Sequence, residues 1–176
     1  MEKRQIAVEI LDWAKYIFGA FAFAFILNNI VIVNANVVSG SMESTIMTDS
    51  RIVGSRLSYK FGEPKRFDII IFKFPDNETT YPYVKRIIGL PNEKVEIRAG
   101  KVYINDSIVP LDDSFINEKT DGNYGPFYVP AGCYFVLGDN RNHSFDSKDW
   151  INKFVSKDKI LGKAVAEYFP APKALH

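Results

Sequence analysis

The longest apolar run of the chain lies close to its N-terminus. Residues 16–33 contain mainly Phe, Ala, Ile and Val, and their polar amides are Asn28 and Asn29. A helix of this length extends about 27 Å, which is close to the thickness of the hydrocarbon core of a bilayer. The pattern therefore predicts a transmembrane helix over residues 16–33.

The charges on either side of this run predict its orientation. Lys3, Arg4 and Lys15 precede the run, whereas residues 34–50 contain no Lys or Arg. By the positive-inside rule, the N-terminal segment lies in the cytoplasm and the remainder lies outside. We expect a single-pass protein of the cell membrane, with a cytoplasmic segment over 1–15 and an extracytoplasmic domain over 34–176.

A cleaved signal peptide is the alternative interpretation of the same run. Its apolar region is usually shorter, and it ends in a small-x-small cleavage site. Residues 35–37 read Ala-Asn-Val and lack that pattern. We therefore expect a permanent anchor.

Beyond residue 34 the apolar residues follow the shorter periods of β-strands. The pattern predicts strands at 67–74, 83–88, 94–98, 101–105, 133–137 and 160–169. Ala99 and Gly100 separate two cleanly alternating strands, which indicates a hairpin. Residues 111–128 are polar and predict a loop. The predicted fold is mainly β with antiparallel sheets, and residues 93–130 form a small inserted hairpin-and-loop region.

Composition excludes several classes of function. The chain has 176 residues, of which 47% are hydrophobic, and a net charge of +1, which argues against disorder and against a nucleic-acid partner. Cys133 is the single cysteine, so an internal disulfide is impossible. With only two histidines, a zinc cluster is not expected either. We expect no metal and no cofactor.

Ser41 and Lys85 are the candidate reactive pair. Ser41 follows the apolar run by eight residues, and Lys85 lies within a predicted strand. A serine needs a base to attack a peptide bond, and a lysine can be that base when its environment removes the proton near neutral pH. Strand alternation places Lys85 on one face with Tyr83 and Ile87, and apolar neighbours lower an amine pKa. Taken singly, each residue has a simpler interpretation. Ser41 would be an exposed serine in a turn, and Lys85 would be a solvated lysine on a strand.

Three segments together resemble the signature motifs of bacterial type I signal peptidases, or leader peptidases. They are residues 39–42 (Ser-Gly-Ser-Met), 83–91 (Tyr-Val-Lys-Arg-Ile-Ile-Gly-Leu-Pro) and 138–148 (Gly-Asp-Asn-Arg-Asn-His-Ser-Phe-Asp-Ser-Lys). Their order and spacing also match, as does the strand at 67–72, and the short chain resembles the form typical of Gram-positive bacteria. The resemblance covers roughly residues 10–168.

This resemblance implies an activity and its partners. The protein would be a membrane-anchored serine endopeptidase with a Ser-Lys dyad. It would cleave signal peptides from exported preproteins after a small residue, at Ala-x-Ala-like sites. The implied partners are preprotein signal peptides, the lipid bilayer and the secretion translocon, and no cofactor is implied.

The resemblance also implies a role for each motif residue. Ser41 would be the nucleophile and Lys85 the general base; Ser39 and the Ser41 backbone N–H would form the oxyanion hole, and Ser144 would hold the Lys85 amine by a hydrogen bond. Behind the site, an ionic scaffold would comprise Asp139, Arg141, Asp146 and Lys148. Shallow pockets that reject large side chains would be lined by Val37, Met42, Ile46, Tyr83 and Val84.

Several positions depart from the family pattern, among them Ser44 and Lys148. Ser44 stands where a proline is usual, which predicts a looser turn behind the nucleophile. Lys148 stands where arginine is common, and lysine cannot make the bidentate contact with a carboxylate.

Alternative interpretations remain at this point. His143 is a second candidate base. The chain could instead be a self-cleaving Ser-Lys protease of the repressor type, or an inactive membrane-tethered β module that binds a partner. The apolar anchor disfavours the first, and the joint presence of Ser39, Ser41, Lys85 and Ser144 disfavours the second.

Overall fold

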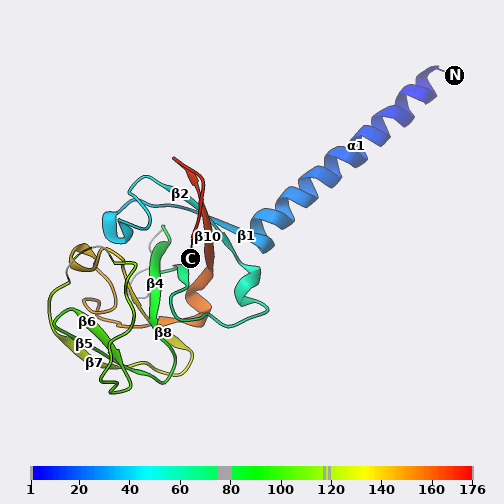
Figure 1. Cartoon of the computed structure of the whole chain (residues 1–176). Coiled ribbons are helices and arrows are strands. Elements are labelled where there is room, and N and C mark those ends of the chain that lie inside the picture. Colours follow the sequence, from blue (N-terminus) through cyan, green and yellow to red (C-terminus); the bar gives the residue numbers. More distant parts are fainter. Residues whose placement is uncertain (1, 75–80, 117, 119, 176) are drawn as a thin grey trace.

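The computed structural model describes residues 2–74, 81–116, 118 and 120–175, and it shows one long helix projecting from a β-rich body (Figure 1). Helix α1 (Glu2–Ile26) continues into a π-helical turn, η1 (Leu27–Val31). The strands are β1 (Ile32–Asn36), β2 (Arg51–Ser55), β3 (Ile69–Phe72), β4 (Tyr83–Gly89), β5 (Lys94–Arg98), β6 (Lys101–Ile104), β7 (Tyr124–Tyr128), β8 (Cys133–Leu137), β9 (Val155–Ser156), β10 (Ile160–Phe169) and β11 (Lys173–Ala174). Short 3₁₀ turns are η2 (Gly40–Met42), η3 (Leu57–Tyr59), η4 (Arg141–His143) and η5 (Lys157–Lys159). The prediction of a mainly β, antiparallel fold is confirmed.

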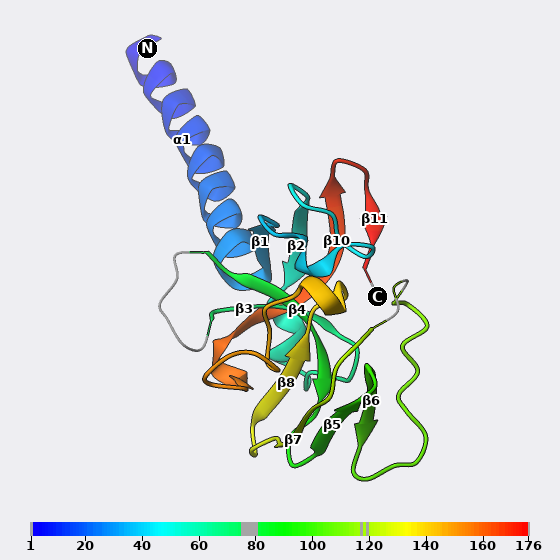
Figure 2. The ribbon, with the colours of Figure 1, turned by 90° about the vertical axis from the view of Figure 1, so that its left-hand side faces the viewer.

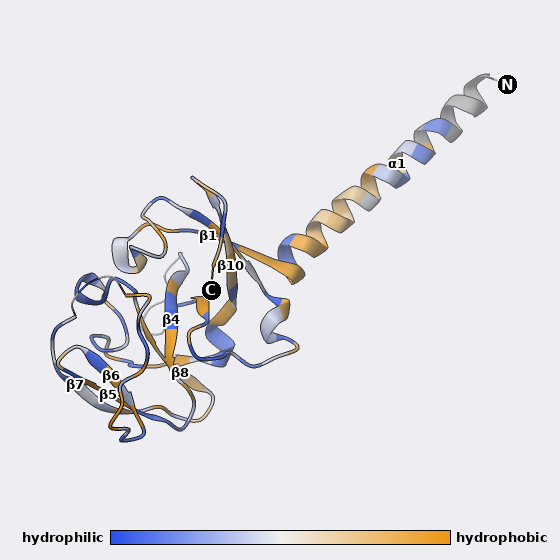
Figure 3. Cartoon of the chain, in the orientation of Figure 1, coloured by the Kyte–Doolittle hydropathy of each residue, from blue (hydrophilic) through white to orange (hydrophobic). Residues whose placement is uncertain are grey.

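The N-terminal helix differs from its prediction at its end. Its segment Leu11–Val31 is long and apolar enough to cross a membrane, and the body buries none of it. Figure 3 shows the apolar residues gathered in the part of α1 next to the body. The predicted end at residue 33 is wrong, because Ile32 and Val33 pair with Ser55 and Gly54 of β2. The apolar run therefore contains the helix end and the first strand.

A large antiparallel sheet carries the anchor on its edge strand. Its order is β1-β2-β10-β3-β4-β8-β9, and β11 pairs with β10 (Figure 2). Arg56, just after β2, holds the junction with the helix. Its backbone N–H donates to the Val31 carbonyl (2.9 Å), and its Nε donates to the Ile32 carbonyl (2.8 Å). The anchor thus runs directly into the sheet.

A separate small sheet lies within residues 93–130, with the order β6-β5-β7. The predicted hairpin is present, with Val95 opposite Ile104. The prediction of a loop over 111–128 is wrong at its end, because β7 pairs with β5 there. Gly125 and Pro126 hide this strand in the sequence, since both residues are typical of turns and only the neighbouring strand stabilises the extended form.

Strand β4 separates two apolar clusters of the core. Val84 packs with Val33, Val37, Met42 and Ile46 on one side. Ile87 packs with Phe72, Phe74 and Trp150 on the other, and Tyr83 lies against that cluster. Lys85, which lies between Val84 and Ile87 in β4, is itself buried.

Candidate active site

The turn η2 presents Ser41 next to β4 of the large sheet. Met42 and Ile46 on either side of the following turn are fully buried, and the Ile46 N–H donates to the Met42 carbonyl (2.7 Å). These two apolar side chains anchor the turn in the core. Ser41 stays half-buried beside a cleft of about 370 Å³.

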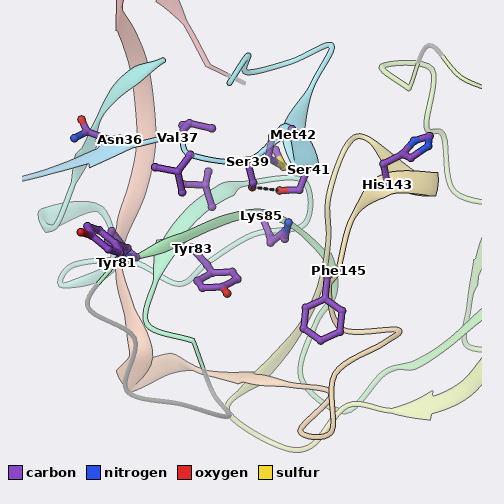
Figure 4. A pocket seen from close by; sticks show the side chains of 14 residues that line it. Asn36, Val37, Ser39, Ser41, Met42, Tyr81, Tyr83, Lys85, His143 and Phe145 are labelled. Carbon is purple, nitrogen blue, oxygen red and sulfur yellow. Dashed lines mark hydrogen bonds between the residues drawn. The ribbon is translucent and has the colours of Figure 1, made fainter. Parts of the chain in front are cut away.

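The Ser41 hydroxyl faces two other polar groups. It lies 3.3 Å from the hydroxyl of Ser39. Figure 4 shows the Lys85 side chain reaching into the same cleft from β4, with its amine pointing toward Ser41. The structure thus brings the predicted nucleophile, base and oxyanion residue together in one cleft.

Burial changes the basicity of Lys85. Its side chain is only 2% exposed, and loss of hydration lowers the pKa of the amine to about 8. The carboxylate of Asp146 opposes this shift, the positive charge of Lys148 adds to it, and Asp139 opposes it again. A useful fraction of the amine is therefore neutral slightly above pH 7.

The third motif packs against the backbone of the nucleophile turn. The Asn140 N–H donates to the Ser41 carbonyl (3.1 Å), and its Nδ2 donates to the Gly40 carbonyl (2.9 Å). A Cβ on Gly138 would lie 2.3 Å from the Ser41 carbonyl oxygen, so only glycine permits this approach. Sequence reasoning gave no role to Gly138 or Asn140, although both lie in the quoted motif.

The ionic scaffold differs from the predicted set. Asp139 pairs with Arg86 in a buried bidentate contact, with Nε–Oδ1 at 2.9 Å and Nη2–Oδ2 at 2.7 Å. Asp139 also accepts a hydrogen bond from the Thr45 hydroxyl. Arg141 instead donates to the Gly138 carbonyl (3.2 Å) and lies 3.9 Å from Asp113.

Sequence reasoning missed Arg86 as the partner of Asp139. The available signal was its place in the middle of an apolar strand, because a buried guanidinium requires a carboxylate. Which carboxylate it meets could not be read from the sequence, since the two residues lie 53 positions apart.

Lys148 pairs with Asp146 (3.2 Å) and Asp149 (3.1 Å), and it donates to the Ser144 carbonyl (2.7 Å). It therefore fixes the backbone that carries Ser144. The Ser144 hydroxyl is buried and has no hydrogen-bond partner among the described residues, so the predicted bond to the Lys85 amine is not formed here.

The cleft contains most of the predicted substrate residues. Val37, Met42, Tyr83 and Val84 line it. Ile46 does not, because it is fully buried in the cluster beneath. The lining residues that sequence reasoning did not assign to substrate are Asn36, Val38, Gly40, Tyr81, Pro82, His143 and Phe145.

His143, the alternative base, lies at the margin of the cleft. Its ring is exposed, and Nδ1 lies 3.2 Å from the Asn140 side-chain oxygen. In Figure 4 it is separate from the Ser41 and Lys85 side chains, which lie together. Its position favours Lys85 as the base.

Among the described residues, no group of three or more His, Cys, Asp or Glu side chains could hold a metal ion. The cleft instead offers a hydroxyl and an amine of lowered pKa. This combination suits nucleophilic attack on a peptide carbonyl, which is the chemistry of a serine protease.

Comparison with known proteins gives the family. The family described as "Signal peptidase, peptidase S26" matches residues 10–169. A probable signal peptidase I-2 of Synechocystis is 35% identical, over 93% of this chain and 75% of the relative. Signal peptidase I P of Bacillus subtilis subsp. natto is 31% identical, over 99% of this chain and 97% of the relative. The chain therefore belongs to the signal peptidases of family S26, serine proteases that cleave signal peptides from preproteins.

Solved structures are similar as well. A signal peptidase I from Enterococcus faecalis is 37% identical, and the alignment covers 57% of this chain and 96% of that one with a TM-score of 0.48.

Proposed function

We propose that this chain cleaves preproteins with Ser41 as the nucleophile and neutral Lys85 as the general base. The observation that carries this proposal is the burial of Lys85, with its lowered pKa, in the same cleft as the Ser41 hydroxyl. A charged, solvated lysine could not accept the serine proton near neutral pH.

The steps follow from the position of each group. Lys85 takes the proton of Ser41 as its oxygen attacks the scissile carbonyl, and the ammonium then protonates the leaving amine. The Ser41 N–H and the Ser39 hydroxyl donate to the oxyanion. Lys85 next activates the water that hydrolyses the acyl-enzyme. Ser144 would approach the amine when substrate closes the cleft, which would also satisfy its unpaired hydroxyl.

The walls of the cleft support specificity for small residues. Val37, Met42 and Val84 are buried, and Met42 is fully so. Side chains packed this tightly leave shallow pockets, and a larger substrate residue would force them apart at a cost of about 1–3 kcal/mol. We infer cleavage after small residues, at Ala-x-Ala-like sites.

The anchor supports an action at the membrane surface. We infer that the part of α1 from residue 16 onward, together with η1, spans the bilayer, with residues 1–15 in the cytoplasm and 34–176 outside. Ser41 lies ten residues beyond Val31, where the candidate span ends. A substrate whose signal peptide ends at the same interface, delivered by the secretion translocon, would meet the cleft at high effective concentration.

The test uses the detergent-solubilised chain and a preprotein with an Ala-x-Ala site. The wild type is expected to release the mature protein, and Ser41→Ala is expected to release none while it keeps the wild-type melting temperature. Ser107→Ala, in the β6–β7 connection, is the matched control and should retain full activity. Cleavage by Ser41→Ala at the wild-type rate would exclude the proposed nucleophile.

A further inference from the structure

The connection between β6 and β7 reaches back over the catalytic motif. Asp113 accepts a hydrogen bond from Lys101 (2.9 Å) and lies near Arg141. The Glu118 carboxylate accepts two hydrogen bonds from Asn142, from the backbone N–H (3.1 Å) and from Nδ2 (3.0 Å). The small sheet is therefore tied to η4, the turn that precedes Ser144.

Phe115, in the same connection, covers the guanidinium of Arg86. The guanidinium carbon lies 4.3 Å from the centroid of the ring, which is a cation–π contact. The ring also meets Phe67 edge-on, with centroids 5.6 Å apart. Arg86 is 3% exposed, and its Nη1 donates to the Phe67 carbonyl (2.8 Å). Phe115 thus closes the face of a buried ion pair against solvent.

This ion pair supports the nucleophile turn through two contacts. Asp139, the partner of Arg86, accepts from the hydroxyl of Thr45, which lies four residues after Ser41. Asp139 also precedes Asn140, whose N–H donates to the Ser41 carbonyl. A shift of the Asp139 carboxylate would therefore move both supports of Ser41.

We propose that Phe115 is a positioning residue for Ser41. Its ring holds the plane of Arg86 and keeps water from the Arg86–Asp139 ion pair, which fixes the backbone behind the nucleophile. Water entering a buried ion pair weakens it, and small displacements of a reacting group carry large rate penalties. The catalytic consequence rests on the function proposed above.

The kinetic test compares three variants of the full chain. Phe115→Leu keeps an apolar side chain but loses the ring face, and it is expected to lower kcat about tenfold with an unchanged KM. Phe115→Tyr keeps the ring and should restore kcat. Phe127→Leu is the matched control, because it removes a ring of strand β7 that stacks on Phe135 and not on the Arg86 guanidinium. It should leave kcat unchanged.

A second measurement does not depend on catalysis. Hydrogen exchange of the Arg86 Nε–H, followed by NMR, should be at least tenfold faster in Phe115→Leu than in the wild type, Phe115→Tyr and Phe127→Leu. The proposal would be overturned if Phe115→Leu had the kcat and the exchange rate of the wild type. It would also be overturned if Phe115→Leu and Phe115→Tyr lost kcat to the same extent. If the wild type itself fails to cleave preproteins, the proposed function fails, and the exchange measurement still decides whether Phe115 holds Arg86.

Discussion

Lys85 shows at the residue scale how the proposed function opposes stability. Its amine is placed among apolar neighbours, which lowers its pKa to about 8 and makes the charged form costly. In the unfolded chain the pKa is that of an ordinary lysine, about 10.4. Below pH 8 both states carry the charge, so the folded state bears the full cost of burying it.

Replacing this amine is therefore expected to stabilise the protein. Between pH 8 and about 10.4 the unfolded chain binds more protons than the folded chain, so wild-type stability rises with pH over that range. Lys85→Met should raise the free energy of unfolding at pH 7, on the order of 2 kcal/mol, and the gain should shrink near pH 10.5. Thermal unfolding of both proteins at the two pH values measures this. If Lys85→Met raised the free energy of unfolding equally at both pH values, the lysine would not be desolvated in the folded protein.

Single residues also show what the sequence could predict. Ser39, Ser41 and Lys85 were predicted from local motifs, and the structure brings them to one cleft. The Arg86–Asp139 pair was not predicted, because the sequence gives the motifs but not their register against each other. The apolar context of Arg86 could only indicate that some carboxylate lies nearby.

At the scale of elements, the turn after the nucleophile explains the departure at Ser44. Glu43 has φ −56° and ψ 151°, and Ser44 has φ 77°, which together form a type II turn closed by the Thr45 N–H and the Met42 carbonyl (3.0 Å). Proline is fixed near φ −65° and cannot occupy this position. A proline at this position would therefore require another type of turn.

This geometry makes opposite predictions for two substitutions. Ser44→Gly should raise the free energy of unfolding by about 1 kcal/mol, because glycine adopts a positive φ without strain. Ser44→Pro should lower it, since the turn must open. Denaturant unfolding measures both, with Ser44→Ala as a control that retains the strain. A stabilising Ser44→Pro would mean that the turn has another conformation.

Element boundaries were predicted where the apolar pattern was unambiguous. The strands over 94–98 and 133–137 have the predicted bounds. The strand over 160–169 also has them, although its residues alternate less well. β1 was missed because it continues the apolar run of the anchor, and β2 because it is short and contains Gly54. The two strands stabilise each other by pairing, and the pattern of residues within either segment does not reveal this pairing.

At the scale of the whole molecule, the junction between anchor and sheet defines where the chain can be cut. Val33 is 5% exposed and belongs to the core cluster beneath the cleft, whereas the body buries no residue of the segment Leu11–Val31. The helix and the domain are therefore separable after Val31 but not after Val33.

Removing residues 1–31 is expected to give a soluble, folded enzyme. It should cleave short peptides at nearly the full rate and bilayer-presented preproteins much more slowly, because it loses the shared interface. Removing residues 1–33 should cost a further 1.5–3 kcal/mol or so of stability, since Val33 leaves the core. Melting temperatures and the two cleavage rates test this. Equal losses on both substrates would mean that the anchor acts in folding rather than in positioning.

The pH dependence of kcat/KM for preprotein cleavage tests the central claim most directly, with wild type and Lys85→Arg measured side by side in detergent. If neutral Lys85 activates Ser41, wild-type kcat/KM rises tenfold per pH unit below about 8 and levels off above it. Lys85→Arg should be inactive at every pH, since a guanidinium stays protonated. A profile that does not rise between pH 7 and 8, or an active Lys85→Arg, would contradict the account and return His143 to the role of base.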